Sequence, residues 1–408
     1  MRIALVNLLV ASILGATLRF IFIREIPGFE FRKILHAHSH IAMLGWAFSA
    51  LYILLTAIFL GPGKLESRYY RNLFWLNQVM VGGMLIAFPI QGYGPFAILF
   101  STGQMVLSYF FAFRLLKDLR QPKSGRPTSS GRMLEASIFW LIFSTLGLWA
   151  MGPIMAMHLK GSSLYVISVQ FYLHFQFNGW FLFSVLAIIF RVLENEGVNT
   201  TSGLLRLFYF MLVSSCALSF ALVITWANPA PVYFWINGTG VMIQLAAMVI
   251  FFKFLWVNRR MLAHQFEQAP KVMMIACVAL GLKTLIQTAV AVPHIAVIAY
   301  TIRFFVIGFI HLLLLGVITT FILGISLCKS WFRSGSKGRQ IGLYIFLSGV
   351  ISSECLLFLQ GILYWAQKGQ LPYFYEALFA VSALMPVGLG WFLLNQFFRF
   401  RLTGEGRN

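Results

Sequence analysis

Long apolar segments dominate the chain and decide what it can fold into. About twelve of them are each roughly 20–30 residues long, enough to cross a hydrocarbon core of about 30 Å. Only 10% of the 408 residues are charged and 60% are hydrophobic, whereas about 25% of a soluble domain is charged. The sequence therefore predicts an all-α integral membrane protein with residues 1–408 as one polytopic transmembrane domain. The expected spans lie near 3–23, 31–60, 73–92, 95–116, 134–158, 163–190, 204–227, 231–257, 272–292, 296–328, 340–366 and 371–397.

The formal net charge of +20 is distributed unevenly along this pattern. The N-terminus, the loops after every second span and the C-terminal tail, counted with Arg114 and Arg206 at the adjoining span ends, hold 22 of the 31 Lys and Arg residues. By the positive-inside rule, this asymmetry predicts that both termini are cytoplasmic. We therefore expect a multi-pass protein of a prokaryotic cytoplasmic (inner) membrane, surrounded by lipid. The charge is a topology signal, so we expect no nucleic-acid partner.

Three histidines recur with nearly one period. His40, His174 and His311 are 134 and 137 residues apart, and each is followed five residues later by glycine. Four predicted spans separate each histidine from the next. This spacing predicts three pseudo-equivalent four-helix units at approximately 1–116, 134–257 and 272–397, with a basic cytoplasmic linker at 117–133.

Histidines inside a membrane are costly and are a functional hypothesis by default. Neutral imidazole suits haem iron, copper and zinc, and two histidines on facing helices can hold a haem from both sides. The candidate metal ligands are His36, His40, His174 and His311. No Cys-x-x-Cys-His motif is present, so a haem would be bound non-covalently.

The second span leaves two candidates for an axial haem ligand. His36 and His40 share a helix face, while His38 points about 160° away from His40. Gly45 lies seven residues beyond His38, where a missing side chain would admit a flat ligand. That spacing favours His38, whereas the repeat register favours His40, and both remain open.

Other charged residues within the spans are candidates for supporting roles. Arg303 precedes His311 by eight residues, about 12 Å along a helix, and would pair with haem propionates. Glu354 and Lys283 lie in the expected spans 11 and 9. They would form an ion pair with each other or relay protons.

This pattern resembles subunit I of the haem–copper oxidase superfamily, which has twelve helices in three arcs and histidines on spans 2, 6 and 10. The segment His38-Ser39-His40-Ile41-Ala42-Met43-Leu44-Gly45-Trp46 is also similar to a segment of the related NnrS proteins, which contain haem and copper and are linked to nitric-oxide stress. The resemblance implies a b-type haem between His311 and either His38 or His40, with His174 at a copper position.

The chain also departs from the oxidase pattern. Span 7 contains no histidine pair, and His311 stands alone on span 10. We therefore expect a single haem, possible copper binding without the full three-histidine site, and electron transfer or diatomic gas chemistry near the outer face. The electron donor would be a separate cytochrome c or a quinol. The alternatives are an oxygen or nitric oxide reductase with a reduced metal site, a twelve-helix transporter, and an assembly factor that keeps the fold without the cofactor.

Overall fold

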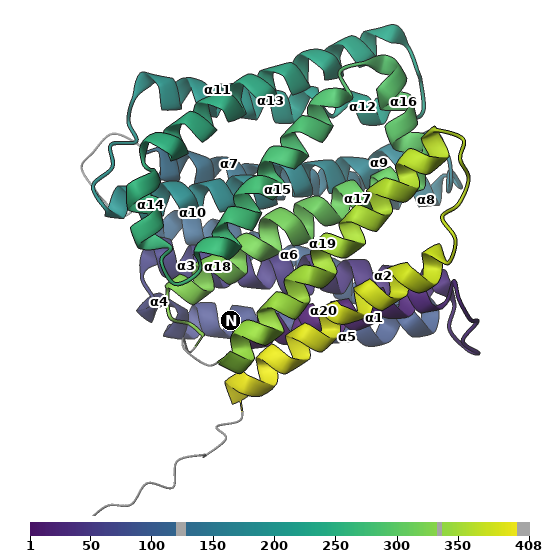
Figure 1. The fold of residues 1–408 in the computed structure, drawn as a ribbon, viewed down its shortest axis with the longest axis horizontal. Helices are drawn as coiled ribbons and strands as arrows, with labels where there is room; N and C mark the ends of the chain where they lie inside the picture. The colour runs from purple at the N-terminus through teal and green to yellow at the C-terminus, as the bar shows by residue number, and fades with distance from the viewer. Residues whose placement is uncertain (120–127, 333–336, 398–408) are drawn as a thin grey trace, which may run out of the picture.

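A computed structural model describes residues 1–119, 128–332 and 337–397 of the chain (Figure 1). The described residues form helices and connecting loops, with no strand among them. Twelve of the helical segments are long and apolar enough to cross a membrane. The predicted all-α membrane fold is therefore confirmed, and exposed apolar side chains such as Ile90 and Trp235 are placed to contact lipid.

Seven of the twelve spans are single helices. They are α1 (Arg2–Phe20), α5 (Arg68–Gln91), α6 (Pro95–Leu119), α13 (Pro231–Val257), α15 (Pro270–Ala289), α19 (Lys337–Trp365) and α20 (Phe374–Phe397). Spans 5 and 7 are each broken into two helices, α7 (Ser129–Ser144) with α8 (Leu146–Ala156), and α11 (Gly203–Leu218) with α12 (Ala221–Ile224). Short helices α4 (Gly63–Glu66), α14 (Arg259–Gln265) and α16 (Pro293–Thr301) lie between spans.

The remaining three spans are the ones that carry the repeated histidines, and each contains a π-helical segment. Span 2 is α2 (Phe31–His40), η1 (Ile41–Phe48) and α3 (Ser49–Leu60). Span 6 is α9 (Ser163–His174), η2 (Phe175–Phe181) and α10 (Leu182–Asn195). Span 10 is α17 (Arg303–His311), η3 (Leu312–Thr319) and α18 (Thr320–Cys328). Every π-helical segment begins directly after one of the three histidines.

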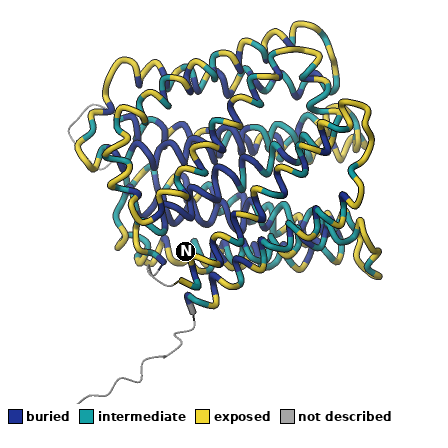
Figure 2. Tube along the Cα trace, in the orientation of Figure 1, coloured by how far each residue is buried: buried dark blue, intermediate teal, exposed yellow. Residues whose placement is uncertain are grey.

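These three spans form the centre of the bundle. In the most apolar stretches of spans 2 and 6, 89% of residues are buried, and in span 10 61%, against 33–50% in the other spans. Figure 2 shows the same buried core surrounded by exposed helices. The indole of Trp46 in η1 donates a 2.7 Å hydrogen bond to the Thr319 hydroxyl in η3. This arrangement supports the hypothesis of three units, which remains a prediction.

The tenth span begins later than the sequence predicted. We expected one helix over 296–328, but Ile302 has an extended backbone (φ −85°, ψ 102°) that separates α16 from α17. Arg303 is therefore the first residue of the span and not a residue within it. The apolar run continues through the break, so hydropathy alone could not reveal it.

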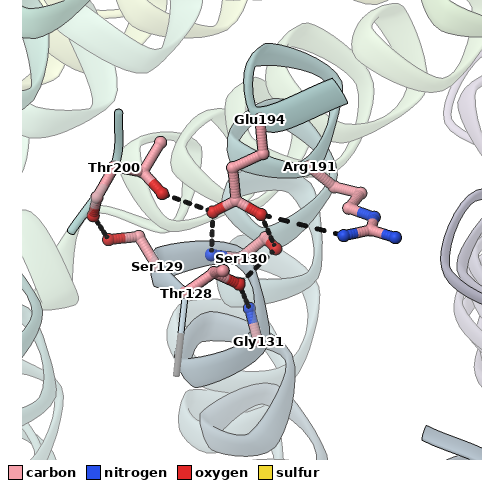
Figure 3. A network of polar contacts seen from close by, with 7 residues as sticks. All are labelled: Thr128, Ser129, Ser130, Gly131, Arg191, Glu194 and Thr200. Atoms are coloured by element: carbon pink, nitrogen blue, oxygen red, sulfur yellow. Dashed lines mark hydrogen bonds and ion pairs between the residues drawn. The ribbon is translucent and has the colours of Figure 1, made fainter. Parts of the chain in front are cut away.

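A polar network fixes the start of α7 to the end of α10 (Figure 3). The Glu194 carboxylate accepts hydrogen bonds from the Ser130 backbone N–H at 2.9 Å, the Thr200 hydroxyl at 2.5 Å, and the Ser130 hydroxyl. Arg191 approaches the same carboxylate at 4.0 Å. A carboxylate beside the first backbone N–H groups of a helix also complements the helix dipole. The network joins spans 5 and 6 at the end of the bundle that also contains the N-terminus (Figure 1).

Candidate functional site

His38 is held against the first span by a hydrogen bond and by a glycine. Its Nδ1–H donates to the Ala11 carbonyl of α1 at 2.9 Å, in the tautomer that leaves Nε2 as a free acceptor. A Cβ added to Gly15 would lie 3.0 Å from Cε1 of the ring, so the imidazole packs directly on the backbone of α1. The ring is therefore fixed in orientation with Nε2 available as a ligand.

His311 reaches the same region from the tenth span. It lies close enough to interact electrostatically with His38 and Arg19. Its Nδ1 is 3.7 Å from Oε1 of Glu354 on α19, which is longer than a hydrogen bond. Both carboxylate oxygens of Glu354 are buried, and neither has a hydrogen-bond partner among the described residues. A buried carboxylate without a partner is costly, so its position beside a histidine requires an explanation.

Two arginines complete this group. Arg19 on α1 interacts electrostatically with Glu354 and Arg303. The Arg303 guanidinium lies 6.0 Å from the centre of the Phe31 ring at the start of span 2. We call His38, His311, Glu354, Arg19 and Arg303 the inner cluster. It combines two imidazoles, one carboxylate and two guanidinium groups from spans 1, 2, 10 and 11.

The structure separates the two candidate ligands of the second span. The Nδ1–H of His40 donates to the His36 carbonyl at 2.8 Å, and both rings lie against Phe88 and Tyr93. His36 and His40 thus share a face, as the helix geometry predicted. His38, and not His40, is the histidine of this span that interacts with His311.

The reason given for His38 from the sequence was nevertheless wrong. Gly45 does not open a space for a flat ligand, because a Cβ there would lie 3.0 Å from the Val81 side chain and 3.3 Å from that of Ile41. The glycine lets α5 pack closely against η1. The feature that does position His38 is Gly15, which the sequence analysis did not single out.

His174 lies apart from the inner cluster. Its Nε2–H donates to the Cys216 carbonyl at 2.8 Å, and the residue lines a cavity of about 430 Å³. Asn178 and Gln287 contribute further polar groups to a wall that is mostly aliphatic and aromatic. The cavity size falls within the usual range of ligand pockets, roughly 300–1,000 Å³.

The expected ion pair between Lys283 and Glu354 is absent. The Lys283 side chain is fully buried, and its Nζ has no hydrogen-bond partner among the described residues. It interacts electrostatically with His174 and Cys216, whereas Glu354 lies beside His311. Of the two alternatives, the ion pair is therefore wrong and the proton relay stays a prediction. The sequence gives the depth of each charged residue in the membrane but not the helix face on which it meets its neighbours.

The four candidate metal ligands do not form one centre. Within residues 1–119, 128–332 and 337–397, no three side chains of His, Cys, Asp or Glu come together as a metal site. His36 and His40 are neighbours, while His174 and His311 have different surroundings. No protein-family model matches the chain, and no curated protein is similar enough to match it.

The described residues thus form a helical membrane protein with twelve candidate spans, in which two histidines from different inner spans belong to one partly buried cluster. The side chains of the inner cluster are of the chemical types that can hold a haem. His38 has a hydrogen-bonded Nδ1 and a free Nε2, which is the arrangement that metal-ligating histidines adopt. Glu354 is a buried carboxylate 3.7 Å from Nδ1 of His311, and the two arginines offer positive charge for carboxylate groups of a ligand.

Proposed function

We propose that this protein binds one haem non-covalently between spans 2 and 10, with His38 and His311 as the axial ligands. The observation that carries the proposal is the orientation of His38, whose Nδ1–H is held by Ala11 while its Nε2 remains free. The two histidines are the eighth residue of span 2 and the ninth of span 10. At 1.5 Å per residue both lie about 10–12 Å from the start of their spans.

The residues of the inner cluster have distinct roles in this proposal. Ala11 orients His38 through a hydrogen bond to Nδ1, which fixes the tautomer of this ring. Glu354, 3.7 Å from Nδ1 of His311, would take the same role for His311 if the two groups moved closer together. Arg19 and Arg303 would pair with the carboxylate groups of the haem and offset their charge. A bound haem would supply reversible one-electron transfer or binding of a diatomic gas such as nitric oxide or oxygen.

The decisive experiment is a reduced-minus-oxidised visible spectrum of the purified protein, with iron and copper quantified in the same sample. We expect sharp α and Soret bands, stoichiometric iron, and loss of the spectrum in His38→Ala and His311→Ala. His40→Ala is the matched control and should keep the spectrum, because His40 faces Phe88 and Tyr93.

Retention of the spectrum in His38→Ala together with its loss in His40→Ala would refute the ligand assignment. A featureless spectrum without bound iron would overturn the haem proposal as a whole. Transport through the twelve-span bundle would then be the function to test, beginning with the cavity beside His174.

A membrane-bound oxygen or nitric oxide reductase is the second candidate, and the cavity that His174 lines is the observation that favours it. A gas substrate needs an apolar path and space near a reactive centre. Copper would bind there through fewer ligands than in the oxidases that the sequence resembles. Turnover of either gas with an artificial electron donor, lost in His174→Ala, would establish this activity, whereas haem without turnover would favour electron transfer.

The partners and the orientation follow from the same proposal. We infer that the electron donor is a separate cytochrome c or a membrane quinol, since the chain has no haem-attachment motif of its own. The basic loops support an orientation with both termini in the cytoplasm and the inner cluster in the outer half of a prokaryotic inner membrane. Labelling of single cysteines introduced in the loops from either side of the membrane tests this orientation.

A further inference from the structure

The opposite face of α2 carries a second pair of histidines. His36 and His40 are one helical turn apart, the spacing at which two histidines on one helix bind zinc. The Nδ1–H of His40 donates to the His36 carbonyl at 2.8 Å. In this tautomer Nε2 of His40 carries the lone pair that a metal ion requires, and its partner in the structure is the Tyr93 hydroxyl at 3.5 Å.

A tyrosine from the next loop closes over this pair. The Tyr93 ring centre lies 4.5 Å from that of His36, and its hydroxyl oxygen is 3.5 Å from Nε2 of His40. Gly92 adopts a left-handed backbone (φ 62°) in the turn that places Tyr93 there. The side chains of His36, His40 and Tyr93 therefore lie together, with the Tyr93 ring against His36 and its hydroxyl beside Nε2 of His40.

The pair lies near the start of span 2, beside an exposed side chain. His36 is the sixth residue of span 2, about 8 Å from its start, and Tyr93 is 53% exposed.

We propose that His36, His40 and Tyr93 form a binding site for a divalent zinc ion at the outer end of span 2. Two imidazoles with oxygen donors are a ligand set that Zn²⁺ accepts, and water completes a four-coordinate site. The site lies on the face of α2 opposite to His38 and needs no haem. Arg32 interacts electrostatically with His36, and this positive charge limits the affinity.

The test is a zinc titration of the full-length protein in lipid nanodiscs, read by calorimetry and by metal analysis after dialysis. We expect one site per chain, with the dissociation constant raised at least about tenfold in His36→Ala and in His40→Ala, since changes around a metal ligand commonly weaken binding 10–100-fold. Tyr93→Phe should weaken binding by a smaller factor. His158→Ala removes a single histidine elsewhere and should bind zinc like the wild type.

X-ray absorption at the zinc edge provides a readout that folding defects do not imitate. Wild-type protein should show two imidazoles with Zn–N distances of about 2.0–2.1 Å. Equal zinc affinity in the wild type and His36→Ala, or a first shell without two imidazoles, would overturn the proposal. The haem proposal is tested separately, because zinc binding should persist in His311→Ala.

Discussion

The close contact between His38 and Gly15 permits a sharp test of how the inner cluster is built. In Gly15→Ala, the new Cβ would lie 3.0 Å from Cε1 and 3.4 Å from Nδ1 of His38. Carbon atoms in ordinary contact are about 3.5–4.0 Å apart, so the imidazole must move by about 0.5 Å. That displacement lengthens the 2.9 Å bond to Ala11 towards the limit of a hydrogen bond.

Two energies of similar size then oppose each other in the free energy of unfolding. Weakening one hydrogen bond costs about 0.5–1.5 kcal/mol, while replacing glycine by alanine inside a helix returns about 1 kcal/mol. The net stability should therefore change by less than about 1 kcal/mol. The gain in helix stability does not restore the orientation of the His38 ring. We therefore expect haem affinity to fall about 10–100-fold.

Separate measurements report on haem affinity and on stability. Haem content per protein and the redox midpoint potential report on the haem site, and the thermal unfolding midpoint reports on stability. Gly82→Ala on α5 is the matched control, because a Cβ there meets no atom within 4 Å. It should gain stability and keep the haem properties of the wild type. If the two variants had the same haem content and potential, the proposed role of the Gly15 contact in ligand orientation would be refuted.

Two further substitutions test polar side chains. Glu354→Gln keeps the shape of the carboxylate but removes its charge, so the protein should retain haem with an altered midpoint potential. Redox titration measures this potential, and an unchanged value would show that Glu354 does not act on the site. Ser130→Ala removes hydrogen bonding to the Glu194 carboxylate and should lower the free energy of unfolding by about 1–3 kcal/mol without changing the haem spectrum, as read by thermal unfolding and visible absorption.

The sequence predicted the spans well because hydropathy identifies the segments that are apolar enough to lie in a bilayer. It placed α13 at 231–257 as the structure has it, and it gave His38 and His311 as candidates. It could not choose between His38 and His40, because the face that a helix turns to its neighbours depends on packing between distant segments. The same limit explains why Glu354 was paired with Lys283, which lies elsewhere in the bundle.

The three inner spans share a His-x₄-Gly spacing. The histidine is the candidate functional group, and the glycine allows a neighbouring helix to pack closely. In each span the histidine ends an α-helix, and the glycine lies within the π-helical segment that follows. Such segments are rare and occur frequently at functional sites. An added Cβ would lie 2.5 Å from the Trp140 side chain at Gly179, 3.0 Å from the Val81 side chain at Gly45, and 3.2 Å from Ala279 at Gly316.

These distances predict an order of damage for the three alanine variants. Gly179→Ala should destabilise most, by more than about 1–3 kcal/mol, because a buried tryptophan must move and not the end of a flexible side chain. Gly45→Ala should be intermediate and Gly316→Ala mildest, as measured by thermal unfolding in one detergent. If Gly316→Ala were as damaging as Gly179→Ala, close helix packing would not account for the glycines. The spacing would then have to reflect a role that all three glycines share, such as the π-helical turn itself.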